Sequence, residues 1–158
     1  MNNKKKKYRP NVAAVVLSSK YPRECEILIA NRSDIKEEIW QFPQGGINEK
    51  EDPKEALFRE LKEEIGTASI EIITEYPKWI AYDFANKSAK KLYPYDGQIQ
   101  KYFLVKLKPS AKIDINTQNP EFCEFMFVKY NNIFDYVSYI KKPIYKQVLA
   151  YFKKMGYL

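Results

Sequence analysis

The segment from residue 45 to residue 67 constrains the fold more than any other part of this chain. It opens on the glycine pair Gly45-Gly46, which predicts a loop whose backbone takes positive φ or approaches a ligand closely. Asp52 and Pro53 have the residue types of a helix N-cap and a first helical position. Gly66 supplies a C-terminal stop. The pattern therefore predicts a helix of about three turns, from Pro53 to about residue 65.

Three glutamates share a face of this predicted helix. Glu60, Glu63 and Glu64 occupy positions i, i+3 and i+4, which project together, and we expect them nearly opposite the apolar stripe of Leu57 and Leu61. Like charges at this spacing destabilise an isolated helix by roughly a few tenths of a kcal/mol each. The ordinary interpretation is a solvated face whose charge is balanced by the cations Arg59, Lys54 and Lys62. The functional one is a hard divalent cation held by oxygen ligands, Mg²⁺ with Mn²⁺ as a substitute.

Composition narrows the chemistry further. The chain of 158 residues contains no histidine, which excludes Ser-His-Asp and Cys-His nucleophiles, helical zinc sites and phosphohistidine intermediates. Its two cysteines lack the spacing of a zinc site or a disulfide framework. A net charge of +7 favours polyanionic partners such as RNA or a nucleotide. No run is long and apolar enough for a membrane helix or signal peptide, so we expect a cytoplasmic protein.

The rest of the chain is expected to be largely β. Apolar, β-branched stretches between turn residues predict strands at 12–17, 26–30, 69–75, 79–84, 101–107 and 123–130. A second helix should begin at Pro143, run to about residue 154 and end before Gly156. We expect a single domain spanning residues 1–158, in which residues 1–7 form a disordered basic N-terminus.

The 45–67 segment resembles the Nudix box, G-x5-E-x7-R-E-U-x-E-E-x-G-U, where U is a bulky aliphatic residue. Every fixed position but the last agrees; Thr67 stands there instead, beside the helix end. Further stretches resemble the bacterial RNA pyrophosphohydrolase branch of that family, whose members are also described as dinucleoside polyphosphate hydrolases. They are Tyr8-Arg9-Pro10-Asn11-Val12, Trp40-Gln41-Phe42-Pro43-Gln44, Gly97-Gln98, Gln100-Lys101-Tyr102-Phe103 and Pro120-Glu121-Phe122. The resemblance implies the Nudix fold, an α+β architecture with a mixed β-sheet sandwiched between helices.

The resemblance also implies roles for individual residues. It places Mg²⁺ on Glu60, Glu63 and Glu64, with the Gly45 carbonyl and Glu121 as further ligands, and it leaves the general base open between Glu64 and Glu121. It pairs Glu51 with Arg59 as structural support of the site. For substrate binding it indicates Arg9, Arg32 and Lys101 for phosphates, and Tyr139 and Ile140 for a base.

Three functions remain open at this point. The first is conversion of 5′-triphosphate or 5′-diphosphate RNA to 5′-monophosphate RNA, which promotes mRNA decay. The second is hydrolysis of diadenosine polyphosphates to ATP and a shorter nucleotide. The third is a non-catalytic module that binds RNA or nucleotide, which the intact carboxylate set disfavours. In each case we expect a monomer without DNA or membrane partners.

Overall fold

A single mixed β-sheet organises the molecule. The computed structural model describes residues 5–85, 92–138 and 140–158. The strands are β1 (Tyr8–Leu17), β2 (Glu26–Arg32), β3 (Trp40–Gln41), β4 (Gln44–Gly46), β5 (Ile70–Glu75), β6 (Ile80–Asp83), β7 (Gly97–Leu107) and β8 (Phe122–Lys129). The helices are α1 (Pro53–Ile65), α2 (Lys142–Lys154) and a short 3-10 helix, η1 (Tyr130–Asp135). None of the helices described here has the length and apolar character needed to cross a membrane.

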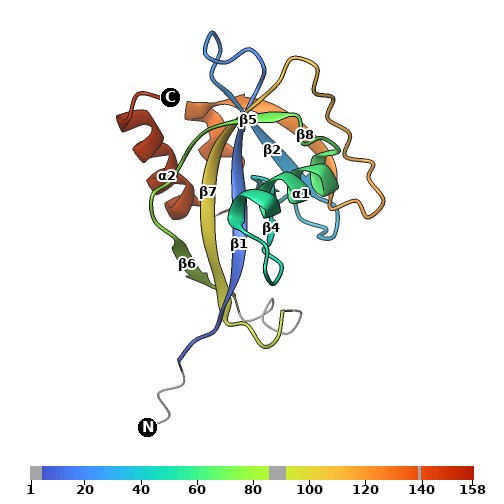
Figure 1. Cartoon of the computed structure of the whole chain (residues 1–158), viewed down its shortest axis with the longest axis vertical. Coiled ribbons are helices and arrows are strands. Elements are labelled where there is room, and N and C mark those ends of the chain that lie inside the picture. Colours follow the sequence, from blue (N-terminus) through green and yellow to red (C-terminus); the bar gives the residue numbers. More distant parts are fainter. Residues whose placement is uncertain (1–4, 86–91, 139) are drawn as a thin grey trace.

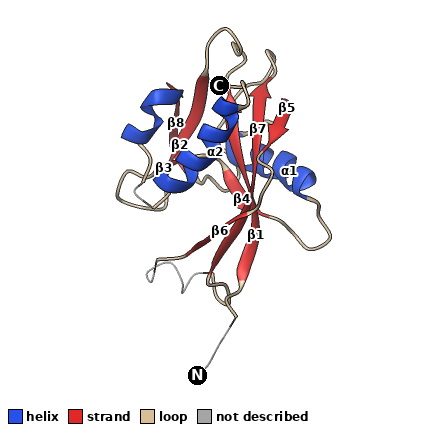
Figure 2. Cartoon of the chain, turned by 90° about the vertical axis from the view of Figure 1, so that its left-hand side faces the viewer, coloured by secondary structure: helices blue, strands red, loops and turns tan. Residues whose placement is uncertain are grey.

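The sheet runs in the order β3-β2-β1-β7-β5, with β4 added on β1, β6 on β7 and β8 on β2. The β1·β7 pair is parallel and the other pairs are antiparallel. Helices α1 and α2 lie on opposite sides of β1 and β7 (Figures 1 and 2). The expected α+β architecture, a mixed sheet between helices, is confirmed.

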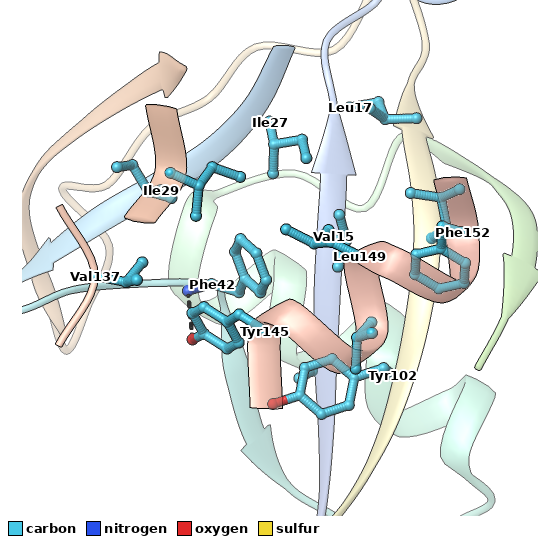
Figure 3. Close-up of a cluster of buried hydrophobic side chains, with 14 of the residues drawn as sticks. Val15, Leu17, Ile27, Ile29, Phe42, Tyr102, Val137, Tyr145, Leu149 and Phe152 are labelled. Atoms are coloured by element: carbon cyan, nitrogen blue, oxygen red, sulfur yellow. Dashed lines mark hydrogen bonds between the residues drawn. The ribbon is translucent and has the colours of Figure 1, made fainter. Parts of the chain in front are cut away.

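Strand β1 is apolar on both faces because both faces are covered. Val12, Ala14 and Val16 pack with α1 in one core, whereas Ala13, Val15 and Leu17 pack with α2 in the other. Such a strand carries a continuous apolar run rather than an alternating pattern. Figure 3 shows the α2 side of this packing, where Tyr102, Leu149 and Phe152 gather on the sheet.

Helix α1 has the predicted bounds, since its capping residues act as their types suggest. The side chain of Asp52 accepts a hydrogen bond from the Glu55 N–H at 2.9 Å, and Gly66 adopts a φ of 75° at the C-terminal end. Helix α2 begins at Lys142, one residue before the predicted start, and Gly156 follows its end with a φ of 85°.

Two predictions about local structure were wrong, and one element was not predicted at all. The Gly45-Gly46 pair forms strand β4 rather than a loop, and neither glycine is among the residues with positive φ. Strands β1 and β7 begin earlier than predicted, at Tyr8 and Gly97, because their parallel pairing extends over polar residues at that end. Residues from Tyr130 to Asp135 form η1, which the sequence pattern did not reveal.

The basic N-terminal segment is partly placed by the structure. Residues 1–4 lie outside the described ranges. Lys6 forms an ion pair with Asp83, and the Lys7 N–H donates to the Asp96 carboxylate at 2.8 Å. Lys6 and Lys7, which we expected to be disordered, therefore make contacts with the sheet end.

Strands β1 and β2 separate along their length, and this separation creates room for the site. Their only paired residues in the described part are Leu17 and Ile27. Beyond this point β3 pairs with β2 at Ala30 and Asn31, while β4 pairs with β1 from Asn11 to Ala13. Residues 42–46 consequently run between the two diverging strands, and we refer to them as the 42–46 segment.

Candidate active site

Glu64 is the most buried carboxylate of the site. Glu64 is 2% exposed. Its Oε2 accepts a hydrogen bond from the Gln44 N–H at 3.1 Å, and its Oε1 has no hydrogen-bond partner. Burial raises the pKa of Glu64 well above its ordinary value, and the charges of Glu121 and Glu60 raise it further. A buried carboxylate oxygen without a donor fits a cation, because desolvated charge needs a compensating partner.

The position of Glu64 corrects one expectation. We predicted it nearly opposite the Leu57/Leu61 stripe, yet it is buried on the same side of α1 as Leu57 and Leu61. Residues at i and i+7 differ by only about 20° around an α-helix of 3.6 residues per turn. Glu64 therefore follows Leu57 on the core-facing side, and the three glutamates spread from the core edge out to solvent.

Glu60 and Glu63 lie progressively further out on α1. The Glu60 side chain is 13% exposed and accepts from Arg59 Nη1 at 2.7 Å, while the Glu63 side chain is 58% exposed and lies 3.3 Å from the same nitrogen. Burial raises the pKa of Glu60, and the guanidinium of Arg59 counters part of that effect. Arg59 thus balances charge that a metal ion would otherwise neutralise.

Gly45 is required by the close approach of Glu60. A Cβ built on Gly45 would lie 1.9 Å from Glu60 Cδ, and one built on Gly46 would lie 2.2 Å from Arg9 Nη2. The two glycines therefore admit a carboxylate on one face of β4 and a guanidinium on the other, since successive residues of a strand point to opposite faces. Close approach, and not positive φ, explains this glycine pair.

The Glu51–Arg59 pair ties the start of α1 to its middle. Arg59 donates from Nε and Nη2 to the two oxygens of Glu51, both at 2.8 Å, and from Nη2 to the Gly46 carbonyl at 2.7 Å. Arg59 is the largest cause that lowers the pKa of Glu51 to about 2, and Glu51 in turn raises the pKa of Arg59. A bidentate Arg–carboxylate pair is geometrically specific, so it fixes β4 against α1.

Glu121 joins the site from outside the helix. It precedes β8, is exposed, and its carbonyl accepts a hydrogen bond from Ser33 N–H at 2.9 Å. Its charge raises the pKa of both Glu60 and Glu64, which places its carboxyl group near theirs. No three carboxylate or thiol side chains in residues 5–85, 92–138 and 140–158 converge closely enough to hold a metal ion as they stand.

The donor set nevertheless fits a hard divalent cation. Glu60, Glu64 and Glu121 repel one another, Glu64 offers an unpartnered oxygen, and only Arg59 supplies a positive charge to α1 carboxylates in the described part of the chain. Oxygen ligands of this kind suit Mg²⁺ and Mn²⁺. A bound cation would replace Arg59 as the positive partner of Glu60 and would relieve the repulsion among the three carboxylates.

The predicted phosphate-binding residues have different surroundings. The half-buried Arg9 lies over Gly46 and beside Gln98, its register partner on β7. Arg32 donates to both oxygens of Asp34, at 3.0 and 2.6 Å. Lys101 is buried, donates to the Tyr76 carbonyl at 2.9 Å and pairs with Glu75 at 3.4 Å. These contacts join β7 to the β5–β6 connection, and the predicted role of Lys101 in phosphate binding stays a prediction.

Of the two residues predicted to contact a base, Tyr139 and Ile140, the structure describes only Ile140. Ile140 is 55% exposed and precedes α2, so its side chain is available to a ligand. Tyr139 lies outside the described residues. Its predicted role in stacking on a base stays a prediction.

Sequence reasoning missed a buried polar cluster on the α2 side of the sheet. Lys141 is 8% exposed, and burial together with the charge of Arg32 lowers its pKa to about 7. Its ammonium donates to Gln44 Oε1 at 3.2 Å and to Gln100 Oε1 at 3.4 Å, and it lies 3.9 Å above the Tyr82 ring. A signal was present in β7, where Gln98 and Gln100 recur with period 2 in a mostly buried strand.

With this geometry in hand, comparison with known proteins assigns the family. A family model described as the NUDIX domain matches residues 7–152. The chain therefore belongs to the Nudix family of hydrolases, whose members generally use divalent metal ions.

Among the similar proteins are bacterial enzymes named RNA pyrophosphohydrolase. The one from a Nitratiruptor species is 65% identical over 153 residues, which cover 97% of this chain and 98% of that protein. The one from Helicobacter pylori is 54% identical, with 97% and 98% covered.

Solved structures agree on the fold. The E. coli dihydroneopterin triphosphate pyrophosphohydrolase superposes with a TM-score of 0.71 at 16% identity and covers 92% of this chain and 99% of its own. A C. elegans Ap4A hydrolase in a binary complex gives 0.69 at 16% identity and covers 93% and 98%. At this level of identity the likeness shows the fold alone.

Proposed function

We propose that this protein is an RNA pyrophosphohydrolase, which converts 5′-triphosphate or 5′-diphosphate RNA ends to 5′-monophosphate ends and so promotes mRNA decay. The observation that carries the proposal is identity of 54–65% over nearly the whole chain to bacterial proteins of that name. The carboxylate cluster alone suits any phosphoanhydride, because catalysis of phosphoryl transfer consists mainly of positioning and charge stabilisation.

The cluster supplies the charge chemistry. We assign Glu60, Glu64 and Glu121 as ligands of Mg²⁺, for which Mn²⁺ can substitute, with Glu63 and the Gly45 carbonyl completing the set. The bound cation would neutralise charge on the cleaved phosphates and lower the pKa of water. The unpartnered oxygen of Glu64 and the repulsion from Glu121 support this assignment.

Two arginines are proposed to hold the phosphates. Arg9 and Arg32 offer planar donors that suit phosphate oxygens. Arg32 already binds the Asp34 carboxylate in a two-pronged geometry, which a phosphate can imitate. Their place beside the buried polar cluster of Gln98 and Lys141 supports a substrate position on that side of β4.

Proton transfer from water is assigned to a carboxylate, because the chain has no histidine. Glu64 and Glu121 are the two candidates. Glu64 offers a buried oxygen without a hydrogen-bond partner, whereas the exposure of Glu121 makes proton release to solvent easier. Rate–pH profiles of Glu121→Gln and Glu64→Gln at saturating Mg²⁺ separate them, because metal binding then no longer varies with pH and the acidic limb disappears only where the base is lost.

A direct competition tests the substrate. Triphosphorylated RNA and diadenosine polyphosphates are supplied at matched concentration with Mg²⁺, and kcat/KM is measured for each. We expect RNA to be preferred. A far higher kcat/KM for the dinucleotide would mean that the protein is a diadenosine polyphosphate hydrolase instead. Inactivity on every nucleotide pyrophosphate would support a non-catalytic binding module.

Variants test the metal assignment. Glu63→Gln and Glu64→Gln should each lower turnover by at least about 100-fold while the fold is retained, as loss of a group that stabilises transition-state charge typically does. Glu55→Gln is the matched control on the same helix. Near-normal turnover in either variant would remove that residue from the ligand set.

A further inference from the structure

The 42–46 segment is held on its α1 side by the carboxylate site itself. The Gln44 N–H donates to Glu64, the Gly46 carbonyl accepts from Arg59, and Gly45 packs against the Glu60 carboxylate. Any displacement of this segment therefore changes the position of two proposed metal ligands at once.

Helix α2 holds the same segment from the opposite side. The Phe42 N–H donates to the Tyr145 hydroxyl at 3.0 Å (Figure 3), and the rings of these two residues stack with centroids 4.0 Å apart. Lys141 donates to Gln44 Oε1 at 3.2 Å. Lys141 and Tyr145 are four residues apart at the start of α2 and so project to the same side. The first turn of α2 thus contacts both ends of the three residues that lead into Gly45.

The burial of Lys141 is costly and calls for an explanation. The ion pairs seen in the described parts of the chain include none for Lys141. Its contacts are two amide oxygens and one ring, and a buried ammonium without an anionic partner is destabilising. A residue that breaks the ordinary rule for burial is expected at a functional site.

The surrounding network fixes the orientation of Gln44. Gln100 Nε2 donates to Gln44 Oε1 and to Asn11 Oδ1, both at 2.9 Å. The Tyr102 hydroxyl donates to Gln100 Oε1 at 2.7 Å. Because each member orients the next, the ammonium of Lys141 sets the direction of the Gln44 side chain, while the Gln44 N–H sets the direction of Glu64.

We propose that Lys141 and Tyr145 are positioning residues of the hydrolase: from the first turn of α2 they hold the 42–46 segment against α1, so that Glu60 and Glu64 meet Gly45 in the geometry that the reaction needs. Neither residue is assigned a contact with the reacting atoms. The inference rests on the proposed function of the carboxylate cluster, and its test includes a measurement that does not depend on activity.

Tyr145→Phe tests the hydroxyl contact. It keeps the ring that stacks on Phe42 but removes the acceptor of the Phe42 N–H. We expect kcat to fall about 10-fold with KM within about twofold, since small displacements of positioned groups act on turnover. Tyr151→Phe is the matched control, because Tyr151 lies on the same helix and packs against Tyr76 instead. Equal kcat in the two variants would overturn the role of Tyr145.

Lys141→Met and Lys141→Arg test the ammonium contact. We expect Lys141→Met to lower kcat and Lys141→Arg to restore most of it, because arginine keeps a donor for Gln44. A rise in KM alone, with kcat unchanged, would overturn the proposal and assign Lys141 to substrate binding. Thermal melting identifies a variant that fails to fold; in that case Lys141→Arg and Tyr145→Phe decide the question.

Amide hydrogen exchange in the metal-free, substrate-free protein supplies the second readout. Exchange at Phe42 and Gln44 should become at least about 10-fold faster in Tyr145→Phe and Lys141→Met than in Tyr151→Phe. Unchanged exchange would overturn the proposal even if activity fell. If the wild type hydrolyses no RNA end, the proposed function fails while the exchange experiment still decides whether α2 holds the segment.

Discussion

Glu64 and Lys141 are ionisable side chains that lie almost out of reach of solvent, and Gln44 lies between them. The acid accepts from the backbone N–H of Gln44, and the amine donates to its side-chain oxygen. Two buried groups of opposite charge type are thus bridged by the dipoles of one neutral residue. The amide groups of Gln44 therefore keep the two buried ionisable groups of the site apart.

Lys141 makes stability depend on pH in a defined window. Its pKa is lowered from 10.5 to about 7, so between these values the unfolded chain binds one proton more than the folded one. Stability therefore rises with pH over this range, by at most about 1.4 kcal/mol per pH unit from this group. Urea unfolding at pH 7.5 to 9.5 should show a shallower rise in Lys141→Met than in the wild type. An equal rise of stability with pH in the two proteins would mean that Lys141 is not buried without an anionic partner.

Glu64 makes stability change with pH in the opposite direction from Lys141. A carboxyl group with a raised pKa contributes stability below its unfolded value of 4.5, and that contribution is lost as pH rises through the folded value. In the presence of EDTA, Glu64→Gln should be about as stable as the wild type near pH 5 and more stable than the wild type near pH 9. Chemical denaturation at both pH values checks this. If adding Mg²⁺ did not reverse the order at high pH, Glu64 would not be a metal ligand.

These residues also show what the sequence could and could not predict. The spacing within one helix indicated Glu60, Glu63 and Glu64 as ligand candidates, whereas Glu121 and the Gly45 carbonyl came only from the family resemblance. The burial of Glu64 depends on which side of α1 meets the sheet, and the i, i+7 relation to Leu57 was the available clue. Lys141 follows no pattern of its own, because its partners lie in β4, β6 and β7, far away in the chain.

Strand β4 is the element on which both sides of the site meet. Its glycines face opposite ways, Gly45 toward Glu60 and Gly46 toward Arg9. Propensity favours a loop here, and only pairing with Asn11 to Ala13 of β1 makes the segment extended. The bounds of α1 and α2 were predictable to within one residue, because the residues that begin and end them lie next to them in the sequence. Strand β4 depends on a partner that is distant in sequence.

Alanine at each glycine should separate the two faces. In Gly45→Ala the new methyl group displaces the Glu60 carboxylate, so kcat should fall by at least about 10-fold. In Gly46→Ala it displaces the Arg9 guanidinium, so KM should rise with a smaller change in kcat. Steady-state kinetics on triphosphorylated RNA measure both. The same change in both variants would mean that β4 simply distorts, and the assignment of its two faces would be wrong.

The whole molecule combines an acidic site with an excess of cations. Its site gathers carboxylates, while the chain as a whole carries a net charge of +7. Long-range attraction of a polyanion therefore depends on lysines and arginines spread over the surface, and the metal ion acts only at short range. Binding and turnover should consequently respond differently to salt.

Salt dependence tests this division. Each phosphate that a basic side chain neutralises releases counterions, with a slope of about −0.7 per phosphate in log–log form for a single strand. Raising salt about fourfold from a low starting concentration should therefore increase KM for a triphosphorylated RNA much more than for a diadenosine polyphosphate, while kcat for both stays nearly constant. Arg9→Gln should lower the RNA slope by roughly one phosphate contact. Equal slopes for the two substrates would show that the protein contacts no RNA beyond the phosphates at the 5′ end, and the surface charge would then have no part in substrate choice.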